Sequence, residues 1–225
     1  MLIRDWMTKD VLTVDENTSL MRATRIMKEN TIRRVPVVSH GRLIGILTDR
    51  DVKDASPSKT TSLDIHELYY LLSEMKVKDV MTPDPLTLHG NESLEKAALV
   101  MMESKISGIP VVDDSDHLIG LLSETDILKG FVKITGIQDG AIQYVLDVAD
   151  KPGAVTTIIQ LLREFDARII SVLTSFQDAR EGMKRVAVRV IVEETKRDDI
   201  IKSLEENFEL VYHSRDELSN LPKKK

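Results

Sequence analysis

Arg33-Arg34-Val35-Pro36-Val37-Val38 is the stretch that decides the fold, because a variant of it occurs a second time as Ser107-Gly108-Ile109-Pro110-Val111-Val112. Each copy continues into a second apolar run and then into a hydroxyl residue placed three positions before an aspartate, within residues 43–51 and 118–126. Self-similarity of this kind indicates a duplicated supersecondary unit. The chain therefore contains one small unit twice.

Each copy predicts a strand, a helix, a β-hairpin and a second helix. The first strands are expected at 11–14 and 86–88, each after a polar turn, residues 7–10 and 81–84. The helices that follow carry apolar stripes at helical spacing, with Asn17 and Asn91 as expected caps. The stripes consist of Leu20, Ala23, Thr24 and Met27 in copy one, and of Leu94, Ala97, Ala98 and Met101 in copy two.

The unit is small, so it exposes one face of a three-stranded sheet, and two copies are expected to bury those faces around a pseudo-two-fold axis. We expect repeat one at 1–60 and repeat two at 77–135. The linker between them, 61–76, is expected to be a helix. Its apolar stripe consists of Leu68, Leu71, Leu72 and Met75.

The spacing of apolar residues changes after Gly136. Alternation and helical spacing predict a strand at 142–148, a helix at 155–165, strands at 168–176 and 185–192, a helix at 197–207 and a strand at 208–213. This βαββαβ order is that of a ferredoxin-like sandwich over residues 140–214, followed by a flexible tail at 215–225. The predicted fold class is mixed α+β and α/β, in two domains of unrelated topology.

Composition excludes several classes of function. The chain has no cysteine and five scattered histidines, so disulfides, thiolate metal sites and a zinc or iron centre are not expected. A net charge of −6 argues against nucleic-acid binding. We found no apolar run long enough for a membrane span and no apolar stretch typical of a signal peptide at the N-terminus, so a cytoplasmic protein is expected.

The two units resemble CBS domains, the tandem of which forms a Bateman module, on the apolar-Pro-Val-Val and Gly-x-x-Thr/Ser-x-x-Asp elements that recur in order. The C-terminal unit, with Asp150-Lys151-Pro152-Gly153 at its first strand-to-helix turn, resembles an ACT domain. The combination, together with residues 49–58, resembles the AcuB-like acetoin-utilisation accessory proteins. Those are understood as regulatory proteins.

The CBS resemblance implies a site for an adenosyl ligand. Thr48 with Asp51, and Ser123 with Asp126, would hold the ribose hydroxyls. The alternative is that each pair is a capping box that satisfies backbone N–H groups without any ligand.

The resemblance also implies apolar walls that flank the adenine ring, for which the alternative is a role as core and sheet-edge residues. These walls would be formed by Val35, Pro36, Ile109 and Pro110, with Thr13, Val14, Thr87 and Leu88 nearby. Arg33 and Arg34 differ from the second copy and would reach phosphates, since the forked donors of arginine suit phosphate oxygens. Alternatively both arginines are solvated or pair with acids such as Glu29.

The ACT resemblance implies a small ligand, such as an amino acid, at Asp150, Pro152 and Gly153. The alternative is an ordinary turn that starts a helix. Dimerisation is expected, because the sheet has edges and a face to cover.

No catalytic motif was found, so no enzyme and no redox or catalytic cofactor are expected. The predicted function is a homodimeric allosteric sensor for AMP, ADP, ATP or S-adenosylmethionine. The alternative is a ligand-free scaffold for a partner enzyme.

Overall fold

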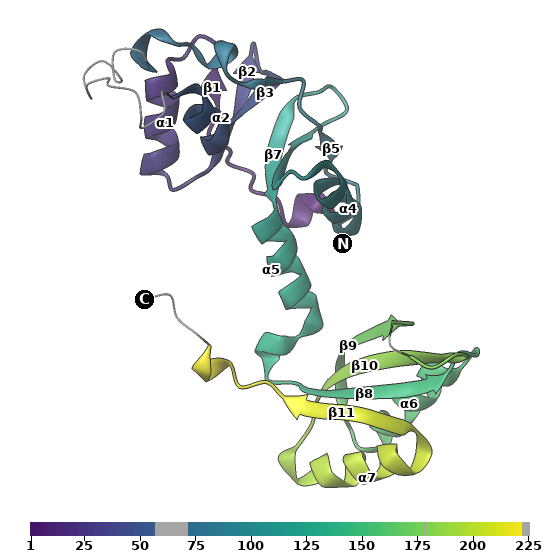
Figure 1. Cartoon of the computed structure of the whole chain (residues 1–225). Helices are drawn as coiled ribbons and strands as arrows, with labels where there is room; N and C mark the ends of the chain where they lie inside the picture. Colours follow the sequence, from purple (N-terminus) through teal and green to yellow (C-terminus); the bar gives the residue numbers. More distant parts are fainter. Residues whose placement is uncertain (57–71, 178, 222–225) are drawn as a thin grey trace. The chain divides into compact units, whose positions relative to one another are not determined.

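The computed structural model describes residues 1–56, 72–177 and 179–221, and the chain divides into two compact units, Met1–Leu128 and Lys129–Lys225 (Figure 1). The first unit contains both repeats up to Leu128, within the last helix of repeat two. The second contains the βαββαβ region. Among the described residues, none of the helices has the length and apolarity that crossing a membrane requires.

The two repeats have the same order of elements. Repeat one contains β1 (Val14–Asp15), α1 (Leu20–Glu29), β2 (Arg34–Ser39), β3 (Arg42–Thr48) and α2 (Asp49–Ala55). Repeat two contains β5 (Leu88–His89), α4 (Leu94–Ser104), β6 (Gly108–Val112), β7 (Leu118–Ser123) and α5 (Glu124–Thr135). In each repeat the first strand pairs in parallel with the first strand of the hairpin. The predicted β-α-β-β-α order is confirmed.

The apolar stripes of α1 and α4 form the two cores, as predicted. Leu20, Ala23 and Met27 lie in the core of repeat one, and Leu94, Ala97 and Met101 occupy the equivalent positions in repeat two. Thr24, half-buried, donates its hydroxyl hydrogen to the carbonyl of Leu20, four residues earlier.

The predicted caps were wrong. Ser19 and Ser93 cap the helices, and their hydroxyl oxygens accept from the backbone N–H groups of Arg22 and Lys96. Asn17 instead accepts a hydrogen bond from Lys78. Asn91 accepts one from Arg4. Both asparagines therefore connect their repeat to a segment distant in sequence, which local spacing does not reveal.

Each repeat is completed by the segment that precedes the other repeat. Ile3, in a 3₁₀ turn (Ile3–Asp5), is fully buried in the core of repeat two, and Val77, in the equivalent turn (Val77–Asp79), is fully buried in the core of repeat one. Thr8 exchanges two backbone hydrogen bonds with Leu121 of β7. The two repeats are thus interlocked.

One of the predicted polar turns is in fact a strand. β4 (Thr82–Pro83) pairs with β3, so the sheet of repeat one has four strands in the order β1-β2-β3-β4 instead of the predicted three. The physical reason is that the exposed edge of a small sheet leaves backbone groups unpaired, and a strand distant in sequence pairs with them.

The predicted linker helix falls mostly outside the described residues, including Leu68 and Leu71. Leu72 and Met75, at its end, pack against the core of repeat one.

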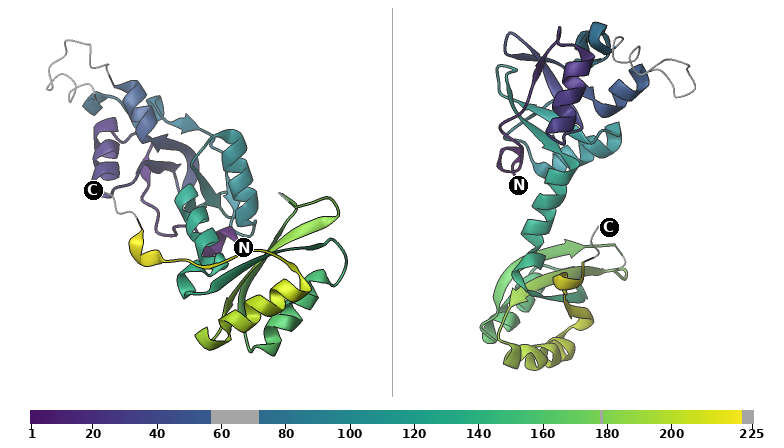
Figure 2. Two further views of the ribbon diagram at one scale, coloured as in Figure 1. Left: turned by 60° about the horizontal axis from the view of Figure 1, so that its bottom comes forward. Right: turned by 90° about the vertical axis from the view of Figure 1, so that its left-hand side faces the viewer.

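The second unit has the βαββαβ order expected from its sequence. It contains β8 (Ile142–Ala149), α6 (Ala154–Glu164), β9 (Arg168–Ser175), β10 (Met183–Ile191), α7 (Arg197–Asn207) and β11 (Glu209–Arg215). The sheet is antiparallel, in the order β11-β8-β10-β9. Figures 1 and 2 show α6 and α7 on one face of this sheet, where alternate residues of β8 and β10 form the core.

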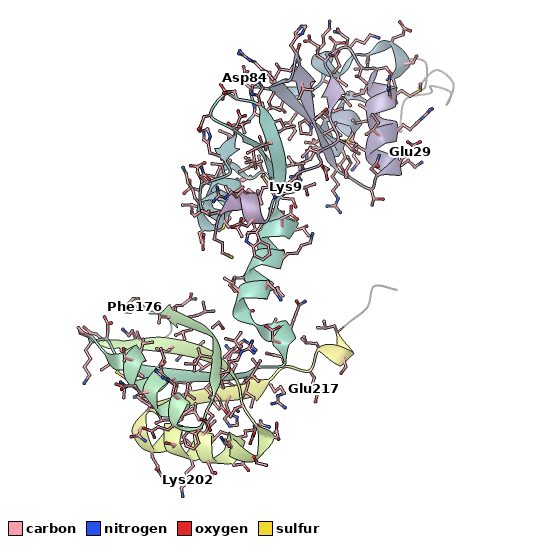
Figure 3. The ribbon with its side chains drawn as sticks, turned by 180° about the vertical axis from the view of Figure 1, so that it is seen from behind. Lys9, Glu29, Asp84, Phe176, Lys202 and Glu217 are labelled. Carbon is pink, nitrogen blue, oxygen red and sulfur yellow. The ribbon has the colours of Figure 1, made fainter. Side chains whose placement is uncertain are left out.

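The other face of this sheet combines ion pairs with exposed apolar side chains. Asp147, almost fully buried, accepts two hydrogen bonds from Arg185 at 2.8 and 2.9 Å. These bonds lower the pKa of the Asp147 carboxyl. Leu173 and Tyr212 expose 41% and 53% of their surface, and Phe176, labelled in Figure 3, exposes 67%.

The start of the predicted tail is ordered by ion pairs. Arg215 belongs to β11 and pairs with Glu194, and Asp216 pairs with Arg189.

Interlocking of the repeats predicts the effect of Ile3→Ala. The substitution removes a fully buried side chain from the core of repeat two, so we expect the free energy of unfolding to fall by about 2–5 kcal/mol. Urea denaturation followed by the fluorescence of Trp6, the only tryptophan, measures it. Lys9→Ala, at an exposed position labelled in Figure 3, is the control and should leave the unfolding free energy within about 0.5 kcal/mol. Equal stability of the two variants would contradict the interlocking.

Candidate functional site

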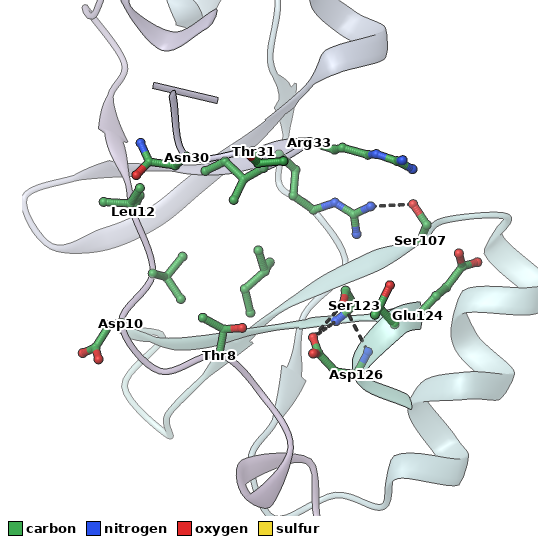
Figure 4. Close-up of a pocket in the computed structure, with 15 residues that line it drawn as sticks. Thr8, Asp10, Leu12, Asn30, Thr31, Arg33, Ser107, Ser123, Glu124 and Asp126 are labelled. Carbon is green, nitrogen blue, oxygen red and sulfur yellow. Dashed lines mark hydrogen bonds between the residues drawn. The ribbon is translucent and has the colours of Figure 1, made fainter. Parts of the chain in front are cut away.

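The first unit contains two pockets of similar size. The Ser123 pocket, of about 620 Å³, is lined by residues 30–34 of repeat one and residues 123–126 of repeat two (Figure 4). The Thr48 pocket, of about 700 Å³, is lined by residues 104–108 of repeat two and residues 48–51 of repeat one. Aligning the two copies makes these linings equivalent position by position. Each pocket is therefore built by both repeats.

This arrangement groups the predicted residues differently from their order in the sequence. In the sequence Arg33 and Arg34 belong to the same copy as Thr48 and Asp51. In the structure the position of Arg34 in the Ser123 pocket corresponds to that of Gly108 in the Thr48 pocket. Arg33 and Arg34 in addition line both pockets.

The hydroxyl and carboxylate pairs lie at the start of the helices that follow the hairpins. Asp51 Oδ2 accepts hydrogen bonds from the backbone N–H and the hydroxyl of Thr48, both at 2.7 Å. Asp51 N–H in turn donates to Thr48 Oγ1. Ser123 and Asp126 have the same geometry, with a hydroxyl bond of 2.6 Å (Figure 4). Thr48 and Asp51 therefore form a capping box at the start of α2.

The capping box uses only one of the two oxygens of the Asp51 carboxylate. All the cap bonds of Asp51 use Oδ2, and within the described part of the chain Oδ1 of Asp51 has no hydrogen-bond partner. A carboxylate oxygen beside a helix N-terminus can accept from ligand hydroxyls while its other oxygen holds the cap. The cap and a binding role are thus compatible.

Arg34 crosses from repeat one to repeat two. Its NH2 group donates to Ser107 Oγ at 2.5 Å (Figure 4). Its NH1 group is buried, and in the described residues it has no hydrogen-bond partner. A Cβ atom on Gly108 would lie 1.4 Å from NH1, so the guanidinium occupies the space that any other residue at position 108 would need.

Burial and neighbouring charges act on the pKa of the Arg34 guanidinium in opposite directions. Burial lowers the pKa of its guanidinium, whereas the carboxylates of Glu124, Asp49 and Asp126 oppose that shift. Arginine remains charged in proteins. The centre of the unit therefore holds a cation with an unsatisfied donor group.

The predicted apolar walls are only partly on the pocket surfaces. Pro110 lines the Thr48 pocket, but Val35 and Ile109 are fully buried in the cores. Pro36 is also buried, and the pocket linings do not include it. The linings also omit Thr13, Val14, Thr87 and Leu88, of which Val14 and Leu88 belong to the cores.

Leu12 and Leu86 provide apolar wall in place of those residues. They line the Ser123 and Thr48 pockets, and expose 45% and 54% of their surface. The sequence analysis missed them because it expected the strands to begin at 11 and 86, whereas β1 and β5 begin at Val14 and Leu88 and the pocket walls come from the segments before them. The available signal was a leucine at the same position in both copies, just before β1 and β5.

The turn Asp150-Lys151-Pro152-Gly153 leads into α6. Gly153 has a φ of +86° and lies at the N-cap of that helix, and Asp150 pairs with Lys184 at 3.3 Å. A small hollow of about 330 Å³ beside the turn is lined by Lys151 and Ala154, among others, but its lining does not include Asp150, Pro152 or Gly153.

Two interlocked β-α-β-β-α repeats with a pair of equivalent pockets define a tandem module of duplicated domains. Residues 3–58 and 77–133 match the model of the CBS domain. The chain belongs to the CBS domain family and contains a tandem CBS pair. The match does not extend into residues 134–225, where the four-stranded antiparallel sheet lies.

Similar proteins include both short and long chains. A CBS domain-containing protein from Dictyostelium discoideum is 31% identical over 134 residues, which is 59% of this chain and 92% of that protein. A putative acetoin utilization protein (AcuB) from Vibrio cholerae is 26% identical, with a TM-score of 0.51 over 62% of this chain and 96% of its own. MJ1225 from Methanocaldococcus jannaschii, described as a putative archaeal homolog of g-AMPK, is 30% identical with a TM-score of 0.50, covering 58% of this chain and 47% of that one.

Some relatives contain the matched region as a minor part. Inosine-5'-monophosphate dehydrogenase from Methanocaldococcus jannaschii is 36% identical over 54% of this chain, but over only 22% of its own length. Two structures with a TM-score of 0.49 contain adenosyl ligands. CBSX2 in complex with AMP is 31% identical, and the match covers 59% of this chain and 97% of that one. The CBS domain pair of MJ0100 in complex with 5'-methylthioadenosine and S-adenosyl-L-methionine is 30% identical, and the match covers 58% of this chain and 99% of that one.

The capping geometry predicts a stability effect that needs no ligand. Ser123→Ala removes the hydroxyl that accepts from Asp126 N–H, so we expect the unfolding free energy to fall by about 1 kcal/mol. Urea denaturation followed by Trp6 fluorescence measures it. Thr125→Ala, an exposed position two residues later, is the control and should have a smaller effect. If the two variants are equally stable, the cap is not a stabilising contact.

Proposed function

We propose that the tandem CBS pair is a regulatory sensor that binds an adenosyl ligand of the AMP, ADP, ATP or S-adenosylmethionine class in its two pockets. The observation that carries the proposal is the unsatisfied NH1 donor of Arg34, which is buried between two pockets that each contain a hydroxyl–carboxylate pair. A buried donor without a partner costs about 1–3 kcal/mol, and a ligand oxygen would remove that cost.

The chemistry of the pockets suits the parts of such a ligand. The two neighbouring ribose hydroxyls would donate to a carboxylate, Oδ1 of Asp51 in the Thr48 pocket. Leu12 and Leu86 offer apolar surface to a planar base. Phosphate oxygens would accept from Arg34 and Arg33, because the guanidinium fork matches their geometry.

The proposed role is regulation without catalysis. The sequence contains none of the catalytic motifs sought, and a ligand regulates by binding one arrangement of the two repeats more tightly than another. Resemblance to the AcuB-like proteins, supported by the similarity to the Vibrio cholerae protein, links this role to acetoin utilisation.

The second unit is proposed to be an ACT domain that dimerises a cytoplasmic protein. Its strand order and the Asp-x-Pro-Gly turn support the ACT assignment. Exposed Leu173 and Tyr212 on the open face of the sheet support dimerisation. Asp150, Pro152 and Gly153 remain the proposed contacts for a small ligand there.

A second candidate function is a ligand-free scaffold that modulates a partner enzyme. The specific observation in its favour is that the hydroxyl–carboxylate pairs are already joined as helix caps. On this alternative the pockets are hollows between the repeats, and no adenosyl compound stabilises the protein.

Isothermal titration with adenosine, AMP and S-adenosylmethionine tests the proposal. Asp51→Asn combined with Asp126→Asn removes both carboxylates, so we expect at least about tenfold weaker binding of each ligand that binds the unmodified protein. Asp54→Asn is the matched control, because Asp54 is exposed at the end of α2 and lines neither pocket.

Thermal denaturation distinguishes the two functions. A ligand at about 100 times its Kd should stabilise the protein by roughly 2.7 kcal/mol. Unchanged melting with all three compounds would favour the scaffold.

A further inference from the structure

Arg34 breaks the symmetry of the duplicated unit at its centre. Positions 34 and 108 are equivalent in the two copies, and each stands at the start of the first hairpin strand, β2 or β6. One position is arginine and the other is glycine. The guanidinium of Arg34 lies where a Cβ atom of residue 108 would be, 1.4 Å from that position. A side chain at position 108 would require this guanidinium to move, and the two equivalent positions together carry a single arginine.

That single arginine lies beside both pockets. Arg34 lines the Ser123 pocket and the Thr48 pocket. Ser107, which also lines both, accepts from NH2, and among the residues that the structure describes NH1 has no hydrogen-bond partner. The nearby acids come from both repeats, since Glu124 and Asp49 occupy equivalent positions after β7 and β3. A phosphate that enters either pocket therefore approaches the same cation.

Arg33 does not duplicate this role. It also lines both pockets, but it is exposed, and Figure 4 shows its side chain extending away from Ser123 and Asp126. Solvent and salt screen an exposed charge, so Arg33 contributes less to phosphate binding in either pocket than the buried Arg34 does.

We propose that Arg34 is one cation shared by two pockets, so that phosphate-bearing ligands bind the pair with negative cooperativity. This inference rests on the proposed function. The first phosphate takes the free NH1 donor and neutralises the charge. A second phosphate then meets the carboxylates of Asp49 and Glu124 with the cation already engaged. An uncharged ligand such as adenosine makes no use of Arg34, and its two binding steps are independent of that residue.

If both pockets share Arg34, the AMP affinities of Arg34→Ala variants differ from those expected if the two bound phosphates merely repel each other. Asp51→Asn leaves the Ser123 pocket as the functional one, and Asp126→Asn leaves the Thr48 pocket. We expect Arg34→Ala to weaken AMP binding about tenfold in each of these single-pocket backgrounds. In the protein with both pockets intact, the same substitution should weaken the first AMP step about tenfold and the second step less than about threefold. Isothermal titration with AMP and adenosine measures all of these constants.

Control variants keep the result interpretable. Arg33→Ala should affect the two AMP steps alike, and Arg34→Ala should weaken adenosine binding much less than AMP binding. The exchange variant Arg34→Gly with Gly108→Arg moves the arginine to the other repeat and should restore AMP binding. Circular dichroism and Trp6 fluorescence check that each variant is folded.

The outcomes separate this inference from the proposed function. If AMP binds and Arg34→Ala weakens both steps equally, or affects only one single-pocket background, sharing is overturned while the adenosyl site stands. A pocket that stays empty of AMP even when the other is disabled also overturns sharing. Absence of any adenosyl binding overturns the proposed function, and this inference with it.

Discussion

The exchange of Ile3 and Val77 between the two repeats is the contact on which the pockets depend. A β-α-β-β-α unit of this size has too little apolar surface to close its own core, and the fully buried side chain that completes it comes from the segment before the other repeat. Interlocking fixes the two repeats against each other. The pockets lie where they meet, so neither repeat alone contains a complete site.

Features that depend on local spacing could be predicted from the sequence. The stripe of Leu94, Ala97 and Met101, the two hairpins and the βαββαβ order all follow from periodicity over a few residues, and the structure contains them. Internal duplication also predicted that both copies fold alike. The spacing of their apolar residues is a local property of the chain, even where the strands pair with distant partners.

Features that depend on distant partners could not be predicted. Asn17 had a helix-capping residue type, but its partner Lys78 is 61 positions away, and Ser19 caps the helix instead. The hydroxyl–carboxylate pairs of the candidate site were found by motif. Their grouping with residues of the opposite repeat was not, because the sequence does not state which copy faces which. Leu12 and Leu86 were missed because the first strands begin later than predicted.

Ser123 and Asp126 form a helix cap, and this affects how ligand binding can be inferred from the sequences of this family. A residue pair that holds a helix in place is retained by selection for folding, whether or not anything binds beside it. Copies of the unit that have lost their ligand would keep the motif intact. Positions such as 34 and 108, where nothing in the fold of one repeat demands arginine or glycine, are therefore better markers of which copies still bind.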